Sequence, residues 1–345
     1  MGGVIHGVFE APSVRGSQAN LLALLDYIRV HQFADLPSCS NSQVQLRPAI
    51  NAAIERLTTE QVPSPRMNAE LLIMFTLDRD RAYLYAHPEH ELTAEEASRY
   101  DAALARRATG EPAQYIIGHQ EFWGMDLIVS PAVLIPRPET EHVVEALLEL
   151  KARRNEEQKQ QQDQRPRTGV SALHEVRIVD VGTGSGAIAL ALAKELPSAE
   201  IHATDISEEA LEVARANAAR YGLTSRIGFH QADLLSDLPI AEFDIVVSNP
   251  PYVGESEEDQ VQLEVRKFEP RNAVFAGPTG LEVIERLIPQ AHDALRPGGT
   301  LILEISGTIA DGVRSLLTGW ADVAIKNDLQ GIPRVVVARK IASGS

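Results

Sequence analysis

The chain has 345 residues, of which 44% are hydrophobic and 23% are charged, and this length leaves room for about two domains. This composition excludes a chain that is disordered throughout. The formal net charge is −16, and a field of that sign repels phosphate backbones, so we expect no nucleic-acid partner. With a single cysteine, Cys39, and no secretory or membrane-spanning pattern, we expect a cytoplasmic protein without disulfides, a bound metal or a membrane partner.

Residues 1–45 form an N-terminal extension to which we assign no role. Its most regular feature is one apolar helical stripe, formed by Leu21, Leu24, Leu25 and Ile28. From residue 46 to residue 110 apolar side chains recur at helical spacing. This spacing predicts a small helical domain.

Residues 111–138 show a different pattern. Short β-like runs at 115–117, 121–123 and 126–129 are separated by Gly118, Gly124 and Pro131. Such runs between turn-forming residues are typical of a hairpin. We therefore expect a β-hairpin linker between two domains.

The remaining residues, 139–345, form the second predicted domain. It begins with a helix at 139–150, followed at about 151–172 by an insertion almost without apolar residues, which we expect to be solvated and mobile. Strands and helices then alternate, with strands expected at 176–181, 200–204, 227–230, 243–248, 300–305, 323–325 and 335–338. Apolar strands separated by helices predict an α/β fold with a parallel sheet covered on both faces.

A glycine-rich segment lies between the first strand of this domain and the helix after it. It reads Asp180-Val181-Gly182-Thr183-Gly184-Ser185-Gly186. Glycines at this position let backbone amides approach a ligand at the start of a helix. The spacing differs from the dinucleotide pattern, because the third glycine follows the second by two residues instead of three.

Two acidic residues end the following strands. Asp205 lies 23 positions after Gly182, and a carboxylate there can accept hydrogen bonds from both hydroxyls of a ribose. Asp233, followed by Leu234, ends the third strand, where it either faces an adenine or simply terminates the strand. The glycine loop and Asp205 together favour a nucleoside-containing cofactor, with S-adenosylmethionine and NAD as the two candidates.

A second motif follows the fourth strand, at the edge of the sheet where such folds bind ligands. It reads Asn249-Pro250-Pro251-Tyr252. The Asn249 side-chain oxygen and the Pro250 carbonyl, held by two stiff prolines, can accept both N–H bonds of a planar NH2 group, while Tyr252 packs on its face. The motif thus resembles that of N-methyltransferases acting on adenine, cytosine or glutamine, and this chemistry needs no metal.

Three further stretches narrow the resemblance. They are residues 110–118, residues 122–124, and residues 134–141, which read Leu-Ile-Pro-Arg-Pro-Glu-Thr-Glu. Together with Pro65-Arg66, residues 268–271, residues 277–281, residues 296–299 and residues 328–334, they resemble the release factor glutamine methyltransferase family (PrmC/HemK). The resemblance covers about residues 46–339.

The resemblance implies a class I S-adenosylmethionine-dependent methyltransferase fold, Rossmann-like, with a seven-stranded and mostly parallel sheet that ends in an antiparallel strand. It implies methyl transfer from S-adenosylmethionine to the side-chain amide nitrogen (N5) of the glutamine in the Gly-Gly-Gln loop of class 1 peptide chain release factors. The helical domain is then the substrate-recognition domain.

The resemblance also implies a set of site residues. The cofactor would be held by Gly182, Thr183, Gly184, Ser185, Gly186, Asp205, Asp233, Leu234 and Asn249. Asn249, Pro250 and Tyr252 would be catalytic, and Asn249, Pro250, Pro251 and Tyr252 would bind the substrate. Arg137 and Glu139 receive no specific role.

Three departures and two rival functions accompany this interpretation. Asn68 stands where the family usually has an acid, the glutamine-rich insertion is longer than expected, and residues 1–45 have no recognised counterpart. The nearer rival is a nucleic-acid adenine N6-methyltransferase, which the negative charge disfavours. The other is a non-catalytic binding module, which the intact motifs disfavour.

Overall fold

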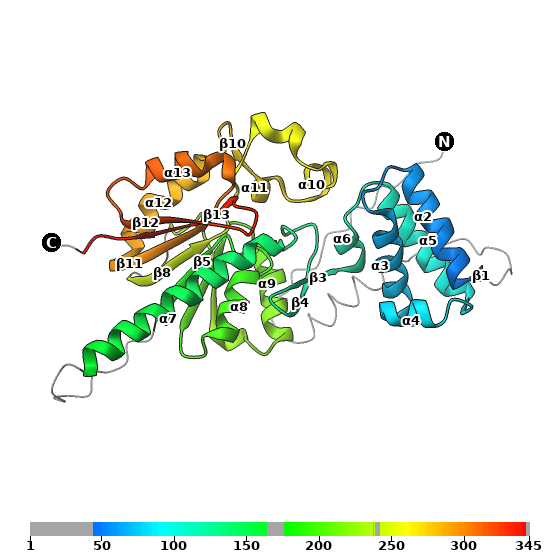
Figure 1. Ribbon diagram of the computed structural model, residues 1–345, viewed down its shortest axis with the longest axis horizontal. Coiled ribbons are helices and arrows are strands. Elements are labelled where there is room, and N and C mark those ends of the chain that lie inside the picture. Colours follow the sequence, from blue (N-terminus) through cyan, green and yellow to red (C-terminus); the bar gives the residue numbers. More distant parts are fainter. Residues whose placement is uncertain (1–43, 164–175, 237, 239–241, 343–345) are drawn as a thin grey trace, which may run out of the picture.

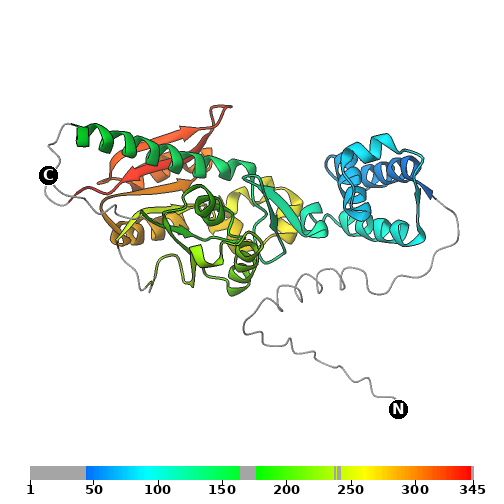
Figure 2. The same cartoon turned by 90° about the horizontal axis from the view of Figure 1, so that it is seen from below.

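The computed structural model describes residues 44–163, 176–236, 238 and 242–342. Within this part of the chain a helical domain and a larger α/β domain are joined by a short helix and a β-hairpin (Figures 1 and 2). The apolar stripe predicted at residues 21–28 lies outside the described residues.

The helical domain packs four helices around one core. They are α2 (Leu46–Thr59), α3 (Pro65–Leu77), α4 (Arg81–Ala86) and α5 (Ala94–Ala108), with β1 (Val44–Gln45) pairing antiparallel to β2 (Glu91–Leu92). Helix α5 begins with a capping box, in which the Thr93 hydroxyl accepts from the Glu96 amide and the Glu96 carboxylate accepts from the Thr93 amide. Leu57, Leu72 and Ile73 are fully buried in the core, as the helical spacing predicts.

The connection between the domains contains one helix that we predicted as a strand. Residues 115–117 belong to α6 (Ala113–Ile117), and only β3 (His119–Phe122) and β4 (Met125–Ile128) form the antiparallel hairpin. Tyr115, Ile116 and Ile117 are all buried, so the segment is apolar on every side and carries no helical period. Gly118, at φ 81°, ends the helix in a left-handed conformation that suits glycine.

The first part of the predicted insertion at 151–172 is helical. A 3-10 turn, η1 (Pro138–Thr140), leads into α7 (Glu141–Asp163), which continues through residues 151–163 and beyond the end of the sheet (Figure 1). Glu, Gln, Lys and Arg are strong helix formers, so this segment can be helical although it has almost no apolar residues. Arg154 also fastens it to the sheet by donating to the Thr300 hydroxyl at 2.6 Å. Residues 164–172 of the predicted insertion lie outside the described part.

The α/β domain contains one seven-stranded sheet of order β12-β13-β11-β8-β5-β6-β7. Its strands are β5 (Arg177–Val181), β6 (Glu200–Asp205), β7 (Ile227–Gln231), β8 (Phe243–Ser248), β11 (Leu295–Glu304), β12 (Ala321–Asn327) and β13 (Pro333–Arg339). The last strand, β13, is antiparallel to both of its neighbours, and the other pairings are parallel. The predicted fold class and strand positions are therefore confirmed.

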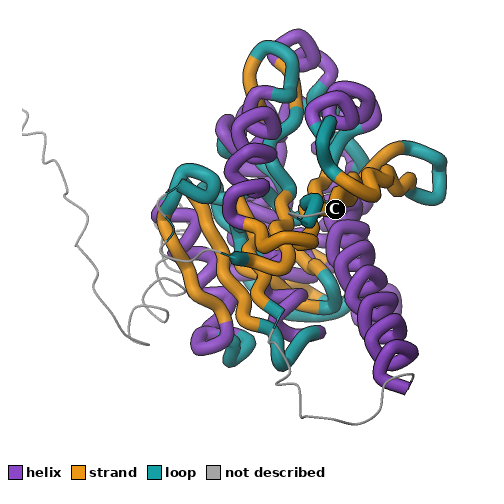
Figure 3. The backbone as a smooth tube through the Cα atoms, turned by 90° about the vertical axis from the view of Figure 1, so that its left-hand side faces the viewer, coloured by secondary structure: helices purple, strands orange, loops and turns teal. Residues whose placement is uncertain are grey.

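Helices cover both faces of this sheet (Figure 3). On one face α7, α8 (Ala187–Glu195) and α9 (Glu208–Arg220) pack on strand residues such as Ile178 and Val247. On the other face α12 (Glu282–Ala294) and α13 (Ala310–Leu316) pack on alternate residues such as Val179 and Val246. This alternation follows from the two-residue period of a strand.

The order of the strands brings the two predicted motifs together. From β5 the chain builds outward through β6 and β7, and it then returns to place β8 on the other side of β5. The loops after β5 and β8 thus diverge from neighbouring strands at the switch point of the sheet, where α/β folds bind ligands. The Ser248 hydroxyl joins the two strand ends by donating to the Val181 carbonyl at 2.7 Å.

Candidate active site

The glycine loop connects the end of β5 to the start of α8. Gly182, Gly184 and Gly186 have φ values of 70°, 55° and 85°, which side chains with a Cβ rarely adopt. A Cβ added to Gly182 or Gly184 would meet nothing within 4 Å, so open space lies beside the loop. At Gly186 a Cβ would meet Leu190 and Ala214 at 3.1 and 3.2 Å, so this glycine allows α8 and α9 to pack closely.

The buried carboxylate of Asp180 holds the glycine loop through a hydrogen bond to Thr183. Asp180 is 1% exposed, and its Oδ2 accepts from the Thr183 hydroxyl at 2.6 Å and from the Ala189 amide at 3.2 Å. Burial raises the pKa of Asp180 to about 7. Its Oδ1 is buried without a hydrogen-bond partner among the described residues. Asp180 was not among the predicted site residues, although it opens the motif.

Asp205, the last residue of β6, also holds the glycine loop. Its Oδ2 accepts from the Gly184 amide at 2.9 Å and its Oδ1 from the Ser207 amide at 3.0 Å. Burial raises the pKa of this carboxyl, and the backbone hydrogen bonds oppose that shift. Each carboxylate oxygen has a second acceptor site, so Asp205 can still receive two hydroxyl groups.

Asp233 and Leu234 follow β7 and lie beside the end of β6. The Thr204 hydroxyl donates to the Leu234 carbonyl at 2.9 Å, and Leu234 has a φ of 59°. The half-exposed Asp233 carboxylate forms an ion pair with Arg286 of α12. An adenine at this position would therefore meet a carboxylate that already has a charged partner.

The Asn249-Pro250-Pro251-Tyr252 turn starts where the buried strand β8 ends. The Asn249 Nδ2 donates to the Thr140 hydroxyl at 3.0 Å, and the Tyr252 hydroxyl donates to Oε1 of Glu304 at 3.2 Å. Burial and the neighbouring carboxylate raise the pKa of Tyr252, so its hydroxyl keeps its proton at neutral pH. Both side chains are thus held by groups from distant parts of the chain.

This turn lines a cavity of about 420 Å³. The other lining residues come from the segment before α7, from the segment after β9 (Val253–Gly254), and from the ends of β11 and β13; they are Leu134, Arg137, Glu139, Val253, Val261, Gln262, Val265, Ala273, Val274, Glu304 and Arg334. Arg137 and Glu139, which received no role from the sequence, are therefore cavity residues. Glu304 was missed because no local motif marks it, and Arg334 was given no site role although it ends the matched stretch 328–334.

Arg137 connects two of the stretches that carry the family resemblance. It forms an ion pair with Glu269, whose side chain is 1% exposed and also accepts from the Ile135 amide at 3.1 Å. Glu269 follows α10 (Leu263–Phe268), a helix beside the cavity. The pairing therefore fixes residues 134–137 against residues 263–269.

The glycine loop, Asp180 and Asp205 suit the predicted cofactor. The loop offers open space where side chains are lacking, and the orphaned Oδ1 of Asp180 and the spare acceptor sites of Asp205 are polar. A sulfonium ligand with a ribose carries both positive charge and hydroxyl donors, which acidic acceptors favour. The open space beside the loop and these acidic acceptors therefore fit S-adenosylmethionine.

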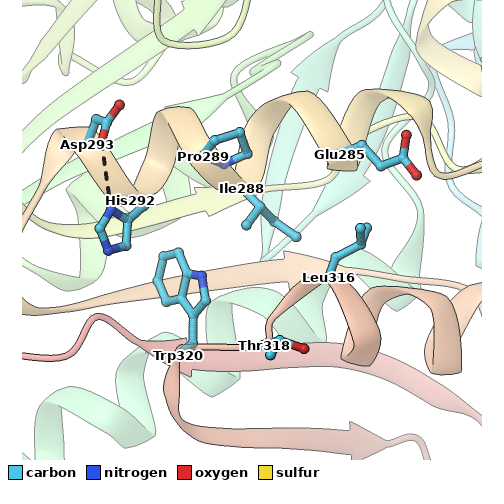
Figure 4. Close-up of a pocket in the computed structure, with 8 residues that line it drawn as sticks. All are labelled: Glu285, Ile288, Pro289, His292, Asp293, Leu316, Thr318 and Trp320. Atoms are coloured by element: carbon cyan, nitrogen blue, oxygen red, sulfur yellow. Dashed lines mark ion pairs between the residues drawn. The ribbon is translucent and has the colours of Figure 1, made fainter.

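A second cavity, of about 330 Å³, lies between α12 and the segment after α13 (Figure 4). His292 and Trp320 both line it, and their rings meet edge to face with centroids 5.6 Å apart. It contains no residue of the glycine loop or of the Asn249 turn. Among the described residues, no helix is long and apolar enough to span a membrane, and no group of three or more His, Cys, Asp or Glu side chains forms a metal site.

Comparisons with known proteins agree with the two-part organisation. A model named PrmC N-terminal domain matches residues 48–118, and one named Methyltransferase small domain matches residues 167–267. A release factor glutamine methyltransferase of Koribacter versatilis is 52% identical over 301 residues, which are 86% of this chain and 99% of that protein. Those of Moorella thermoacetica and Chlorobaculum tepidum are 42% and 40% identical, covering 79% and 83% of this chain and 89% and 94% of theirs. The chain therefore belongs to the PrmC family of release factor glutamine methyltransferases, which depend on S-adenosylmethionine.

Proposed function

We propose that this enzyme methylates the side-chain amide nitrogen of the glutamine in the Gly-Gly-Gln loop of class 1 release factors, and that the cavity beside Asn249 receives that glutamine. The observation that carries the proposal is the juxtaposition of this cavity with the glycine loop at the switch point between β5 and β8. A methyl donor on the loop and an amide in the cavity would then meet at one edge of the sheet.

The cofactor would be held by the amides of residues 182–186, by Asp205 and by the segment of Asp233 and Leu234. When bound, S-adenosylmethionine supplies a methyl group on a positively charged sulfur. The glycine loop lets the backbone amides come close to the cofactor. Asp205 offers carboxylate oxygens to the cofactor hydroxyls, and it also holds the loop by accepting from the Gly184 amide.

The chain's own part in the reaction is to orient the amide nitrogen. Its lone pair is delocalised, so the nitrogen is a poor nucleophile until it is aligned with the methyl group. Asn249 Oδ1 and the Pro250 carbonyl accept hydrogen bonds from the two N–H groups of the substrate amide. These hydrogen bonds strengthen as positive charge develops on the nitrogen. The methylated nitrogen is acidic enough to release its proton to water, so no strong base is required.

Tyr252 would pack on the flat face of the substrate amide. Its hydroxyl is engaged by Glu304, which leaves the ring itself to line the cavity. A ring held in one orientation restricts the substrate amide to one plane. This alignment raises the rate because the amide loses less freedom of motion on reaching the transition state.

The helical domain would recognise the rest of the release factor. It lies beside the cavity, because Arg107 of α5 forms an ion pair with Glu264 of α10 at 2.7 Å. Residues 46–110 would then form the recognition domain, and residues 111–138 the linker that sets its position.

The test is transfer of label from S-adenosylmethionine. The purified protein is incubated with a release factor, with its Gln→Ala variant in the Gly-Gly-Gln loop, and with DNA. We expect label on the release factor alone. Label on DNA would support the adenine methyltransferase instead, and cofactor binding without any transfer would support the binding module.

A further inference from the structure

Two buried polar side chains from separate elements lie behind the Asn249 turn. Thr140 belongs to η1 and is 5% exposed, and Glu304 ends β11 and is 2% exposed. Together they contact both polar side chains of the turn, Asn249 and Tyr252. Buried polar groups are costly unless they are paired, so a cluster built from three elements has a definite arrangement.

The hydrogen-bond donors of the Asn249 turn point toward Thr140 and Glu304. Asn249 donates through Nδ2 to the Thr140 hydroxyl at 3.0 Å. That hydroxyl has a single hydrogen of its own, and it lowers the pKa of the Glu304 carboxyl, whose buried Oε2 has no hydrogen-bond partner among the described residues. Tyr252 donates to the same carboxylate. An ionised carboxylate only accepts, so it favours a Thr140 hydroxyl that turns its hydrogen toward Glu304 and accepts from Asn249.

The direction matters because the two ends of an asparagine amide have opposite roles. With Nδ2 committed to Thr140, the amide presents Oδ1 on its other side, as an acceptor for the substrate amide. A reversed amide would present N–H groups to the substrate N–H groups, and these repel one another.

We propose that Thr140 and Glu304 are positioning residues for methyl transfer: Glu304, acting through the Thr140 hydroxyl, sets which end of the Asn249 amide faces the substrate, and it holds Tyr252 directly. This inference rests on the proposed function, because it assigns the support behind the same site. In this proposal both residues act through Asn249 and Tyr252, so neither is called catalytic.

The proposal carries a pH dependence. The groups that face Glu304 are the hydroxyls of Thr140 and Tyr252, the Glu139 carboxylate and the Arg334 guanidinium. Burial, aided by Glu139, raises the pKa of Glu304 to about 7, against the hydrogen bonds and Arg334. A protonated Glu304 can donate to Thr140 and so permit the reversed chain. Turnover therefore rises with pH through neutrality.

A pair of Thr140 variants tests the proposal. Thr140→Val keeps the shape and loses the hydroxyl, so we expect kcat to fall about 10- to 100-fold with the affinity for S-adenosylmethionine unchanged. Thr140→Ser keeps the hydroxyl, and we expect turnover within about threefold of the wild type. Thr76→Val, which removes another buried hydroxyl that donates to its own helix at 2.8 Å, is the matched control for stability.

Glu304→Gln provides a second test that keeps the volume of the side chain. Its neutral amide can donate to Thr140, so we expect lower kcat at pH 8 and loss of the rise in kcat near pH 7 that the wild type shows. Equal kcat in Thr140→Val and Thr140→Ser, or an unchanged pH profile in Glu304→Gln, would overturn the inference while leaving the proposed function intact. Failure of the wild type to methylate the glutamine would overturn both.

Discussion

In the proposed mechanism Asn249 acts on the substrate amide and Asp205 acts on the cofactor, from neighbouring parts of the sheet edge. Asn249 lies in the cavity, where its side chain can meet the substrate amide. Asp205 ends β6 beside the glycine loop, where it accepts from the Gly184 amide. Substitutions at the two positions should therefore affect different kinetic quantities.

Replacing Asn249 with alanine removes one acceptor for the developing charge and leaves the glycine loop intact. We expect kcat to fall at least about 100-fold, with the dissociation constant of S-adenosylmethionine within about threefold of the wild type. Steady-state kinetics and calorimetry measure the two quantities. Wild-type turnover in this variant would rule out the role given to Asn249.

Replacing Asp205 with alanine removes acceptors from the cofactor and also frees the Gly184 amide. We expect the affinity for S-adenosylmethionine to fall about 10- to 100-fold, because a hydrogen bond to a charged group is worth about 1.5–3 kcal/mol. Asp205→Asn keeps one acceptor and should lose less. Calorimetry that finds the same affinity in all three proteins would refute the assignment.

Single residues also show where sequence reasoning ends. The glycine loop and the Asn249 turn are local motifs, so their residues could be named from the sequence. Thr140 contacts Asn249 from 109 positions away, and Glu304 contacts Tyr252 from 52 positions away. Such contacts depend on which strands become neighbours, and no local spacing encodes that.

At the scale of elements, α10 links the helical domain to the cavity. Val265 of α10 lines the cavity, and its neighbour Glu264 pairs with Arg107, which is 3% exposed and also donates to Asn68 at 2.8 Å. Lys267 adds a hydrogen bond to the Thr109 carbonyl at 3.0 Å. The wall of the cavity is therefore fastened to the proposed recognition domain.

Glu264→Ala should weaken this connection and leave the buried Arg107 without its charged partner. We expect the KM for the release factor to rise about 3- to 10-fold, a loss of about 1 kcal/mol, with the KM for S-adenosylmethionine unchanged. Asp259→Ala is the matched control, because it removes a fully exposed partner of Arg266 from the same segment. Equal KM values for both variants would show that the Arg107 pairing does not support substrate binding.

The elements that were misread from the sequence share one cause. The spacing of apolar residues identifies a helix that is buried on one side. It does not identify a helix that is apolar on all sides or one that has almost no apolar residues. Helix α6 is buried all round, and the second half of α7 has almost no apolar residues. The sheet strands could be predicted, because apolar runs bounded by turn residues mark them directly.

At the scale of the molecule, two buried carboxyls tie folding to pH. Burial raises the pKa of Asp180 and of Glu304 to about 7. Between their ordinary values near 4 and this value the folded state binds more protons than the unfolded state. Each group therefore lowers the free energy of unfolding as the pH rises through that window, by about 1.4 kcal/mol per pH unit at most.

Asp180→Asn removes one of these titrations and keeps an acceptor for Thr183. The free energy of unfolding of this variant minus that of the wild type should be larger at pH 8 than at pH 5. Urea denaturation of both proteins without ligand at the two pH values measures this difference. A difference that does not change with pH would contradict the raised pKa of Asp180.

The most direct test of the whole account is the position of the transferred methyl group. After reaction with the wild-type enzyme, mass-spectrometric fragmentation of the Gly-Gly-Gln peptide of the release factor locates the added mass. The account predicts one methyl group on the glutamine side-chain amide. A methyl group on any other atom of the release factor, or an unmodified peptide from an enzyme that binds S-adenosylmethionine, would contradict it.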